Sequence, residues 1–133
     1  MAALRAGSPS LLLNGVTALV VEEDRDNREL LGAYLQLEGA TVLSVGSIAA
    51  ALETSGPIDI LVTELLLGDG DGCDLLRRLR GQAGRESLPA IALTALSDAD
   101  WIQRAIGAGF EHCAIKPVPL SELTRLIRLL SRK

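Results

Sequence analysis

Short runs of apolar residues alternate along the chain with longer runs in which apolar positions recur every three or four residues. The apolar runs are Thr17–Val21, Thr41–Val45, Ile58–Thr63, Ala90–Thr94 and Cys113–Ile115. Most are rich in Val, Leu and Ile, and several are nearly continuous, which is typical of strands covered on both faces. We therefore predict five buried strands.

Amphipathic helices are predicted after each of these strands. In the first, Leu30, Leu31, Tyr34 and Leu37 fall on one helical face. The apolar positions of the other four lie within 48–52, 75–79, 102–106 and 123–130. Five β-α units in series predict the α/β class, with a doubly wound five-stranded parallel sheet. For one small sheet of this kind we expect the strand order 2-1-3-4-5.

Length and composition indicate one domain without a nucleic-acid or membrane role. The 133 residues suit a single core, which we place at 15–133 after an N-terminal extension or linker at 1–14. A net charge of -4 and 2% aromatic residues argue against nucleic-acid binding. The apolar runs are too short to span a bilayer, and we see no secretory signal, so we expect a cytoplasmic protein. Two cysteines and one histidine lack the spacing of a zinc site.

Polar residues follow the predicted strands where a functional crevice would form. The first strand ends on Glu22 and Glu23, the third on Glu64, the fourth on Thr94 and the fifth on Lys116. Ligand sites of open α/β sheets lie beyond the carboxyl ends of the strands at the switch point. Taken singly, acids near a helix start, a strand threonine and a surface lysine are ordinary. Their joint arrangement is more specific, and it predicts one shared crevice.

Four stretches carry a resemblance to a known family. They are residues 18–30, 59–72, 89–95 and 108–117, the last of which includes Lys116 and Pro117. From about Gly15 to Ser131 the sequence resembles the receiver domains of two-component response regulators, whose fold is flavodoxin-like. The last two stretches are especially similar to receivers of hybrid sensor kinases.

The resemblance assigns roles to the residues at the strand ends. It implies that Glu22 and Glu23, together with Glu64, occupy the positions that hold Mg²⁺. Glu64 stands at the phosphoacceptor position, and Thr94 and Lys116 at the positions that contact the phosphoryl group. A cis Lys-Pro bond is also implied. The implied partners are a histidine kinase or another signalling protein, with a possible homodimer through the face of helix four, strand five and helix five.

The sequence departs from the family pattern at its acidic positions and at Cys113. The family has Asp at the acceptor position, and Glu64 extends its carboxylate by one C–C bond, roughly 1.5 Å. A misplacement near 1 Å can cost ~10²-fold in a reaction that depends on positioning. The extra length also opposes Mg²⁺, a possible cofactor that demands tight octahedral geometry. Cys113 stands at the switch position but is too small to act as the usual ring, and His112 alternates to the other side of the strand.

These departures favour an atypical, non-enzymatic receiver that acts through protein–protein contacts. We predict that Lys116 pairs with Glu64, takes over part of the metal's role and holds one fixed conformation. The main alternative is a working Mg²⁺-dependent phosphoacceptor in a phosphorelay. A small metal-dependent hydrolase is a remote alternative, because no nucleophile with an adjacent base is visible.

Overall fold

A computed structural model describes residues 11–95 and 99–131, so residues 1–10 of the predicted extension lie outside the described residues. One sheet contains five parallel strands in the order β2-β1-β3-β6-β7. In chain order these are β1 (Thr17–Val21), β2 (Thr41–Val45), β3 (Ile60–Glu64), β6 (Ala90–Thr94) and β7 (His112–Ile115). The order 2-1-3-4-5 predicted for the five main strands is therefore confirmed.

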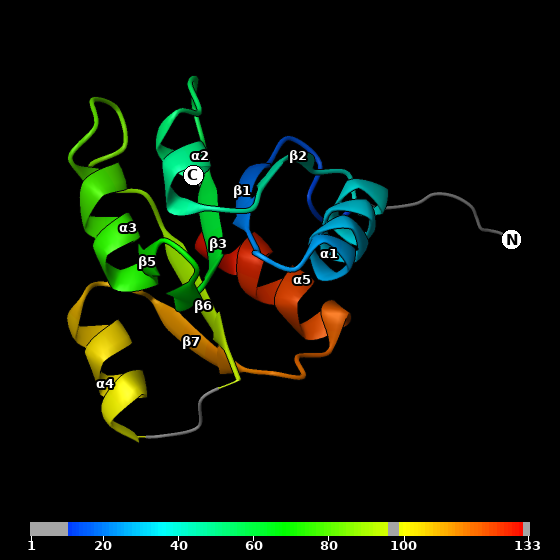
Figure 1. Ribbon diagram of the computed structural model, residues 1–133. Helices are drawn as coiled ribbons and strands as arrows, with labels where there is room; N and C mark the ends of the chain where they lie inside the picture. Colours follow the sequence, from blue (N-terminus) through cyan, green and yellow to red (C-terminus); the bar gives the residue numbers. More distant parts are fainter. Residues whose placement is uncertain (1–10, 96–98, 132–133) are drawn as a thin grey trace, which may run out of the picture.

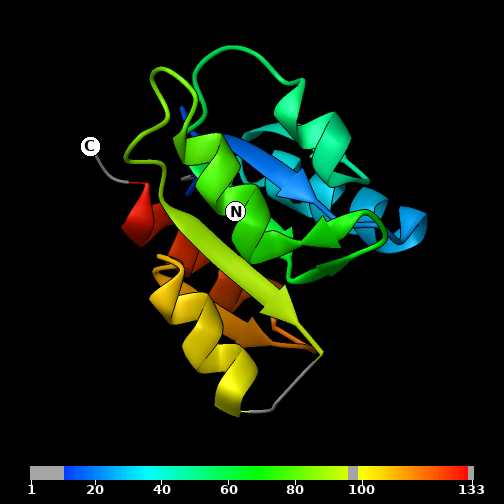
Figure 2. The same ribbon diagram turned by 60° about the vertical axis from the view of Figure 1, so that its left-hand side comes forward.

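Helices cover both faces of this sheet (Figures 1 and 2). One face carries α1 (Arg25–Leu37) and α5 (Leu120–Leu130), and the other carries α2 (Ile48–Leu52), α3 (Gly72–Arg80) and α4 (Ala99–Gly107). Successive strand residues alternate between these layers, because side chains along a strand point to opposite faces. In β1, Leu19 packs with the α2–α4 layer, whereas Ala18 and Val20 pack with the α1–α5 layer.

The parallel register brings the carboxyl ends of the central strands to one edge of the sheet. Val21 of β1 lies opposite Thr63 of β3, and Glu64 lies opposite Leu93 of β6. The next pair along this edge joins Thr94 to Ile115. The sheet thus fixes where each strand-end side chain begins.

The predicted boundaries of two strands were wrong by one or two residues. β3 begins at Ile60 rather than Ile58, and it contains Glu64, which was expected to follow the strand. The Asp59 side chain accepts a hydrogen bond from the Thr17 backbone N–H at 2.8 Å. This bond links the residue before β3 to the start of β1. β7 begins one residue earlier than predicted, at His112.

A small hairpin after β3 was not predicted. β4 (Leu66–Leu67) and β5 (Gly70–Asp71) pair antiparallel between β3 and α3. From the turn of this hairpin, Asp69 accepts hydrogen bonds from the backbone N–H groups of Ile48 and Ala49. These bonds lower the pKa of Asp69. They also anchor the segment that follows Glu64 to the start of α2.

Within the described ranges, no helix combines the length and apolar character needed to cross a membrane.

Candidate functional site

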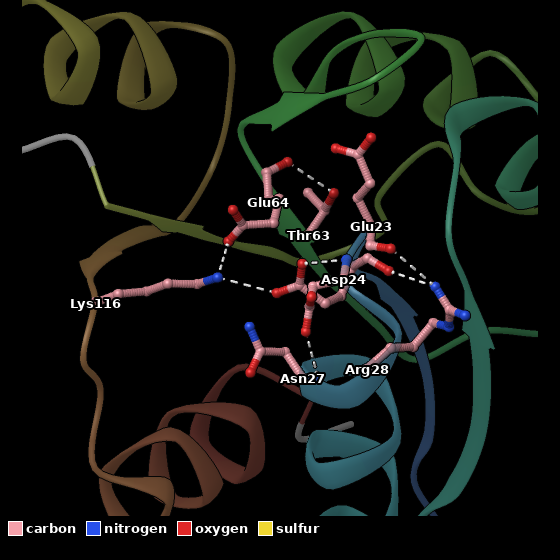
Figure 3. Close-up of polar contacts among 8 residues, drawn as sticks. Glu23, Asp24, Asn27, Arg28, Thr63, Glu64 and Lys116 are labelled. Atoms are coloured by element: carbon pink, nitrogen blue, oxygen red, sulfur yellow. Dashed lines mark hydrogen bonds and ion pairs between the residues drawn. The ribbon is translucent and has the colours of Figure 1, made fainter.

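The carboxyl ends of β1, β3 and β7 meet around the ammonium group of Lys116 (Figure 3). Its Nζ lies 2.6 Å from Oε2 of Glu64 and 2.9 Å from Oε1 of Glu22. The predicted pair with Glu64 is confirmed. The second pair, with Glu22, was not predicted. One cation therefore joins two carboxylates from neighbouring strands.

All three side chains are largely removed from water. The side chains of Glu22, Glu64 and Lys116 are 8%, 16% and 29% exposed. Oε2 of Glu64 is buried and forms a close ion pair with Nζ of Lys116. Burial raises the pKa of Glu64, and the negative charges of Glu22 and Glu23 raise it further, so contact with Lys116 offsets the rise only in part.

The same geometry keeps Lys116 charged. Burial alone would lower its pKa, but hydrogen bonding and charge from Glu64 and Glu22 outweigh that effect, so the pKa is raised. The crevice therefore holds a protonated lysine whose charge is shared between two acids.

The two acids after β1 take different directions. Oε2 of Glu22 accepts the Asp24 backbone N–H at 3.1 Å, so both oxygens of Glu22 are used. The Glu23 carboxylate turns away from Lys116 and lies over the backbone at Gly68, where a Cβ would approach its Oε2 to 2.5 Å. The loop between β1 and α1 is held by polar contacts. Arg28 of α1 donates hydrogen bonds to the carbonyl oxygens of Glu22 and Glu23. The Asp24 side chain caps α1 by accepting the Asn27 backbone N–H.

Thr94 ends β6 on the same edge and is 2% exposed. The Lys116 backbone N–H donates to the Thr94 carbonyl oxygen at 2.8 Å, which ties the two strand ends together. The peptide bond between Lys116 and Pro117 is cis, as the family resemblance implied.

The hairpin after Glu64 also contacts α4. Asp71 caps α3 through the Cys73 backbone N–H and pairs with Arg104 at 2.9 Å. The Arg104 guanidinium lies 5.0 Å from the centroid of the Trp101 ring. Gly72 is required by a close approach, since a Cβ there would lie 2.5 Å from the Glu64 carbonyl oxygen. Sequence reasoning missed this link, because Asp71 and Arg104 are far apart in the chain.

Cys113 of β7 is partly buried against the layer formed by α2, α3 and α4, while His112 is exposed. Their predicted placement on opposite sides of the strand agrees with this difference. Burial raises the pKa of Cys113. Burial and the negative charge of Asp71 raise the pKa of Cys73 to about 11. Both thiols are therefore protonated near neutral pH.

The side chains in this arrangement do not fit a bound Mg²⁺. The ammonium of Lys116 lies between the two carboxylates that a metal would join, and Glu23 points elsewhere. In the described part of the chain, no three acidic, histidine or cysteine side chains are grouped as a metal would need. A metal could enter only after Lys116 and the acids rearranged.

Comparison with known proteins places the chain in one family. The family model for the response regulator receiver domain matches residues 18–128, so the chain belongs to the receiver domain family of two-component signalling. Receiver domains interact with histidine kinases and other signalling proteins, and they generally bind Mg²⁺ at this crevice.

Individual relatives support the same assignment. An uncharacterized 14.6 kDa protein of Leptolyngbya boryana is 39% identical over 113 residues, covering 83% of this chain and 86% of that protein. The transcriptional regulatory protein GltR of Pseudomonas aeruginosa is 36% identical over 126 residues, covering 90% of this chain. The chain spans 29% of a Thermotoga maritima cyclic di-GMP phosphodiesterase and 50% of GltR, so their whole-protein activities do not transfer.

Among solved structures, the receiver domain of sensor histidine kinase PA1611 from Pseudomonas aeruginosa superposes with a TM-score of 0.80. It is 26% identical and covers 88% of this chain and 98% of its own. That structure has a magnesium ion coordinated in its active site cleft. In the present chain, Lys116 contacts two of the acids at the strand ends.

Proposed function

We propose that this receiver domain signals through protein contacts in one fixed conformation, without conventional phosphorylation. The observation that carries the proposal is the contact of one ammonium with two carboxylates, Lys116 with Glu22 and Glu64. In this proposal Glu64 occupies the phosphoacceptor position, and Thr94 and Lys116 occupy the phosphate-contact positions.

Two physical effects oppose phosphoryl transfer to Glu64. Its oxygen Oε2 is buried and already paired with Lys116, so attack on a donor through that oxygen requires breaking the pair. Transfer also needs a metal to offset the charge of the phosphoryl group, and the acids hold an ammonium where that metal would bind. Mg²⁺ affinity is accordingly weak in this proposal.

The Glu64–Lys116 pair also reproduces part of a phosphorylated state. A glutamate reaches one bond further than an aspartate, toward the space that a phosphoryl group would fill. It supplies a charge of -1 rather than roughly -1.5 to -2, so the imitation is incomplete. The fixed conformation is the signal in this proposal, and partners recognise it directly.

The test is incubation of the full chain with Mg²⁺ and acetyl phosphate, followed by intact-protein mass spectrometry. We expect no phosphoryl adduct on the natural chain. Glu64→Asp shortens the side chain by roughly 1.5 Å and is expected to yield an Mg²⁺-dependent adduct, which serves as the positive control. An adduct on Glu64 of the natural chain would establish the alternative, a working phosphoacceptor.

A further inference from the structure

The carboxylate of Glu23 lies in a space that is open because residue 68 is a glycine. A Cβ atom at Gly68 would lie 2.5 Å from Oε2 of Glu23 and 3.3 Å from its Cδ. Contacts below 3.0 Å are essentially never made by real Cβ atoms, so a side chain at this position would displace the carboxylate. The backbone of Gly68 does not have a positive φ, so its conformation alone does not call for glycine. The constraint on this position is therefore the contact with Glu23.

The backbone on each side of this contact is held in place. Arg28 donates a hydrogen bond to the Glu23 carbonyl oxygen at 3.3 Å. On the other side, Asp69 follows Gly68 in the hairpin turn and accepts two backbone N–H groups at the start of α2. The Glu23 side chain is exposed and has three torsions, so it is the part that can move. A Cβ at residue 68 would therefore be accommodated by rotation of this side chain.

The crevice beside Lys116 can receive the displaced carboxylate. A cavity of about 540 Å³ is lined by Glu23 together with Glu22, Glu64 and Lys116. In the described part of the chain, the Glu23 carboxylate has no ion pair or hydrogen bond that would keep it over Gly68. Its charge contributes to the raised pKa of Glu64, so the acids repel one another across this distance.

The position of Glu23 changes the charge that a cation in the crevice must balance. With Glu23 turned away, the ammonium of Lys116 faces two carboxylates, from Glu22 and Glu64. With Glu23 turned inward, three carboxylates would share the crevice, and one ammonium would leave a larger negative charge uncompensated. A divalent cation with oxygen ligands suits three carboxylates better.

We propose that Gly68 determines which cation the crevice holds, because it gives Glu23 room to turn away from Lys116. Gly68 acts as a positioning residue through Glu23 and does not itself contact the cation. The glycine favours the internal ammonium, and a side chain at the same position favours Mg²⁺. This inference rests on the proposed function, in which Lys116 takes the place of the metal.

The test compares Mg²⁺ binding by the full natural chain and by Gly68→Ala, followed through amide chemical shifts at constant ionic strength. An apparent Kd falls as the fraction of molecules already arranged for binding rises, so we expect Gly68→Ala to bind Mg²⁺ at least about 3-fold more tightly. Gly107→Ala is the matched control. A Cβ at Gly107 of α4 would meet no atom within 4 Å, so this variant should keep the Kd of the natural chain.

Two further backgrounds show whether the effect passes through Glu23. In Glu23→Gln, adding Gly68→Ala should change the Kd by less than about 2-fold, because the displaced side chain no longer carries a charge. In Lys116→Met, no ammonium competes with the metal, and adding Gly68→Ala should again tighten binding at least about 3-fold. Circular dichroism of each variant checks that the chains compared are folded.

Equal Mg²⁺ affinity with and without Gly68→Ala in both the natural and the Lys116→Met backgrounds would overturn the inference. A gain of the same size in Glu23→Gln would overturn it as well, since the effect would then bypass Glu23. The phosphodonor experiment reports separately. An adduct on Glu64 of the natural chain would reject the proposed function whatever Gly68→Ala does, whereas an unchanged Kd without an adduct would reject only the role of Gly68.

Discussion

Removing the cation from the crevice should destabilise the domain in a way that depends on pH. In Lys116→Met, the carboxylates of Glu22 and Glu64 would face each other without an ammonium between them. Breaking a buried ion pair costs about 3–5 kcal/mol, and we expect about 3 kcal/mol at pH 7 because Lys116 keeps some contact with water. The assay is urea unfolding followed by circular dichroism, with the slope checked for a common unfolding transition.

The pH dependence follows from Glu64. Its pKa is raised above 4.5 in the folded chain, and loss of Lys116 would raise it further. An acid whose pKa is raised by folding destabilises the folded state above that pKa, and the penalty disappears as pH falls below the unfolded value. The loss caused by Lys116→Met should therefore shrink to less than half at about pH 4.

Two further measurements use the same variant. Adding Glu64→Gln to Lys116→Met should recover about half of the loss, because it removes one of the two repelling charges. Mg²⁺ at about 10 mM should stabilise Lys116→Met by about 1.4 kcal/mol if the freed acids bind it with a Kd near 1 mM, and the natural chain less. We call the contact of Lys116 with Glu22 and Glu64 the lysine clasp. A loss below about 0.5 kcal/mol at pH 7, or one that is unchanged at about pH 4, would refute this clasp as a source of stability.

Three other changes test features outside the clasp. Arg85 is buried and donates to the carbonyl oxygens of Thr54 and Gly56, so Arg85→Ala should cost about 2–3 kcal/mol in urea unfolding; full stability of Arg85→Lys would show that the fork geometry is unimportant. Asp71→Ala should cost about 1–2 kcal/mol through the lost cap and the exposed pair with α4, whereas Asp71→Asn, which keeps a capping oxygen, should lose less than about 1 kcal/mol. With its pKa at about 11 against 9.0, Cys73 should be alkylated by iodoacetamide about 100-fold more slowly at pH 8 than in the urea-unfolded chain, and equal rates would contradict the raised pKa.

The sequence predicted the fold well, because strands covered by helices on both faces consist of nearly continuous apolar residues. The crevice was equally predictable, since parallel strands must deliver their carboxyl ends to one edge. The direction in which each acidic side chain points could not be predicted. Glu22 reaches Lys116 while Glu23 turns toward Gly68, and a side chain with three torsions gives no sequence signal for that choice.

The hairpin of β4 and β5 was missed for a different reason. Its strands have two residues each, which is too short for any periodicity to appear. The contacts it makes, from Asp69 to α2 and from Asp71 to Arg104, join residues about 20 to 33 positions apart. Such long-range polar contacts depend on the finished packing rather than on local pattern.

The lysine clasp also affects how long the signal of the domain lasts. An acyl phosphate hydrolyses, so a receiver that carries one has a signal with a built-in decay. The contact of Lys116 with Glu22 and Glu64 consists of side chains of the same chain, and it forms whenever the domain folds. Under the proposed function, the duration of the signal would equal the lifetime of the polypeptide itself. Synthesis, degradation and partner occupancy would then set its level in place of a kinase and a phosphatase.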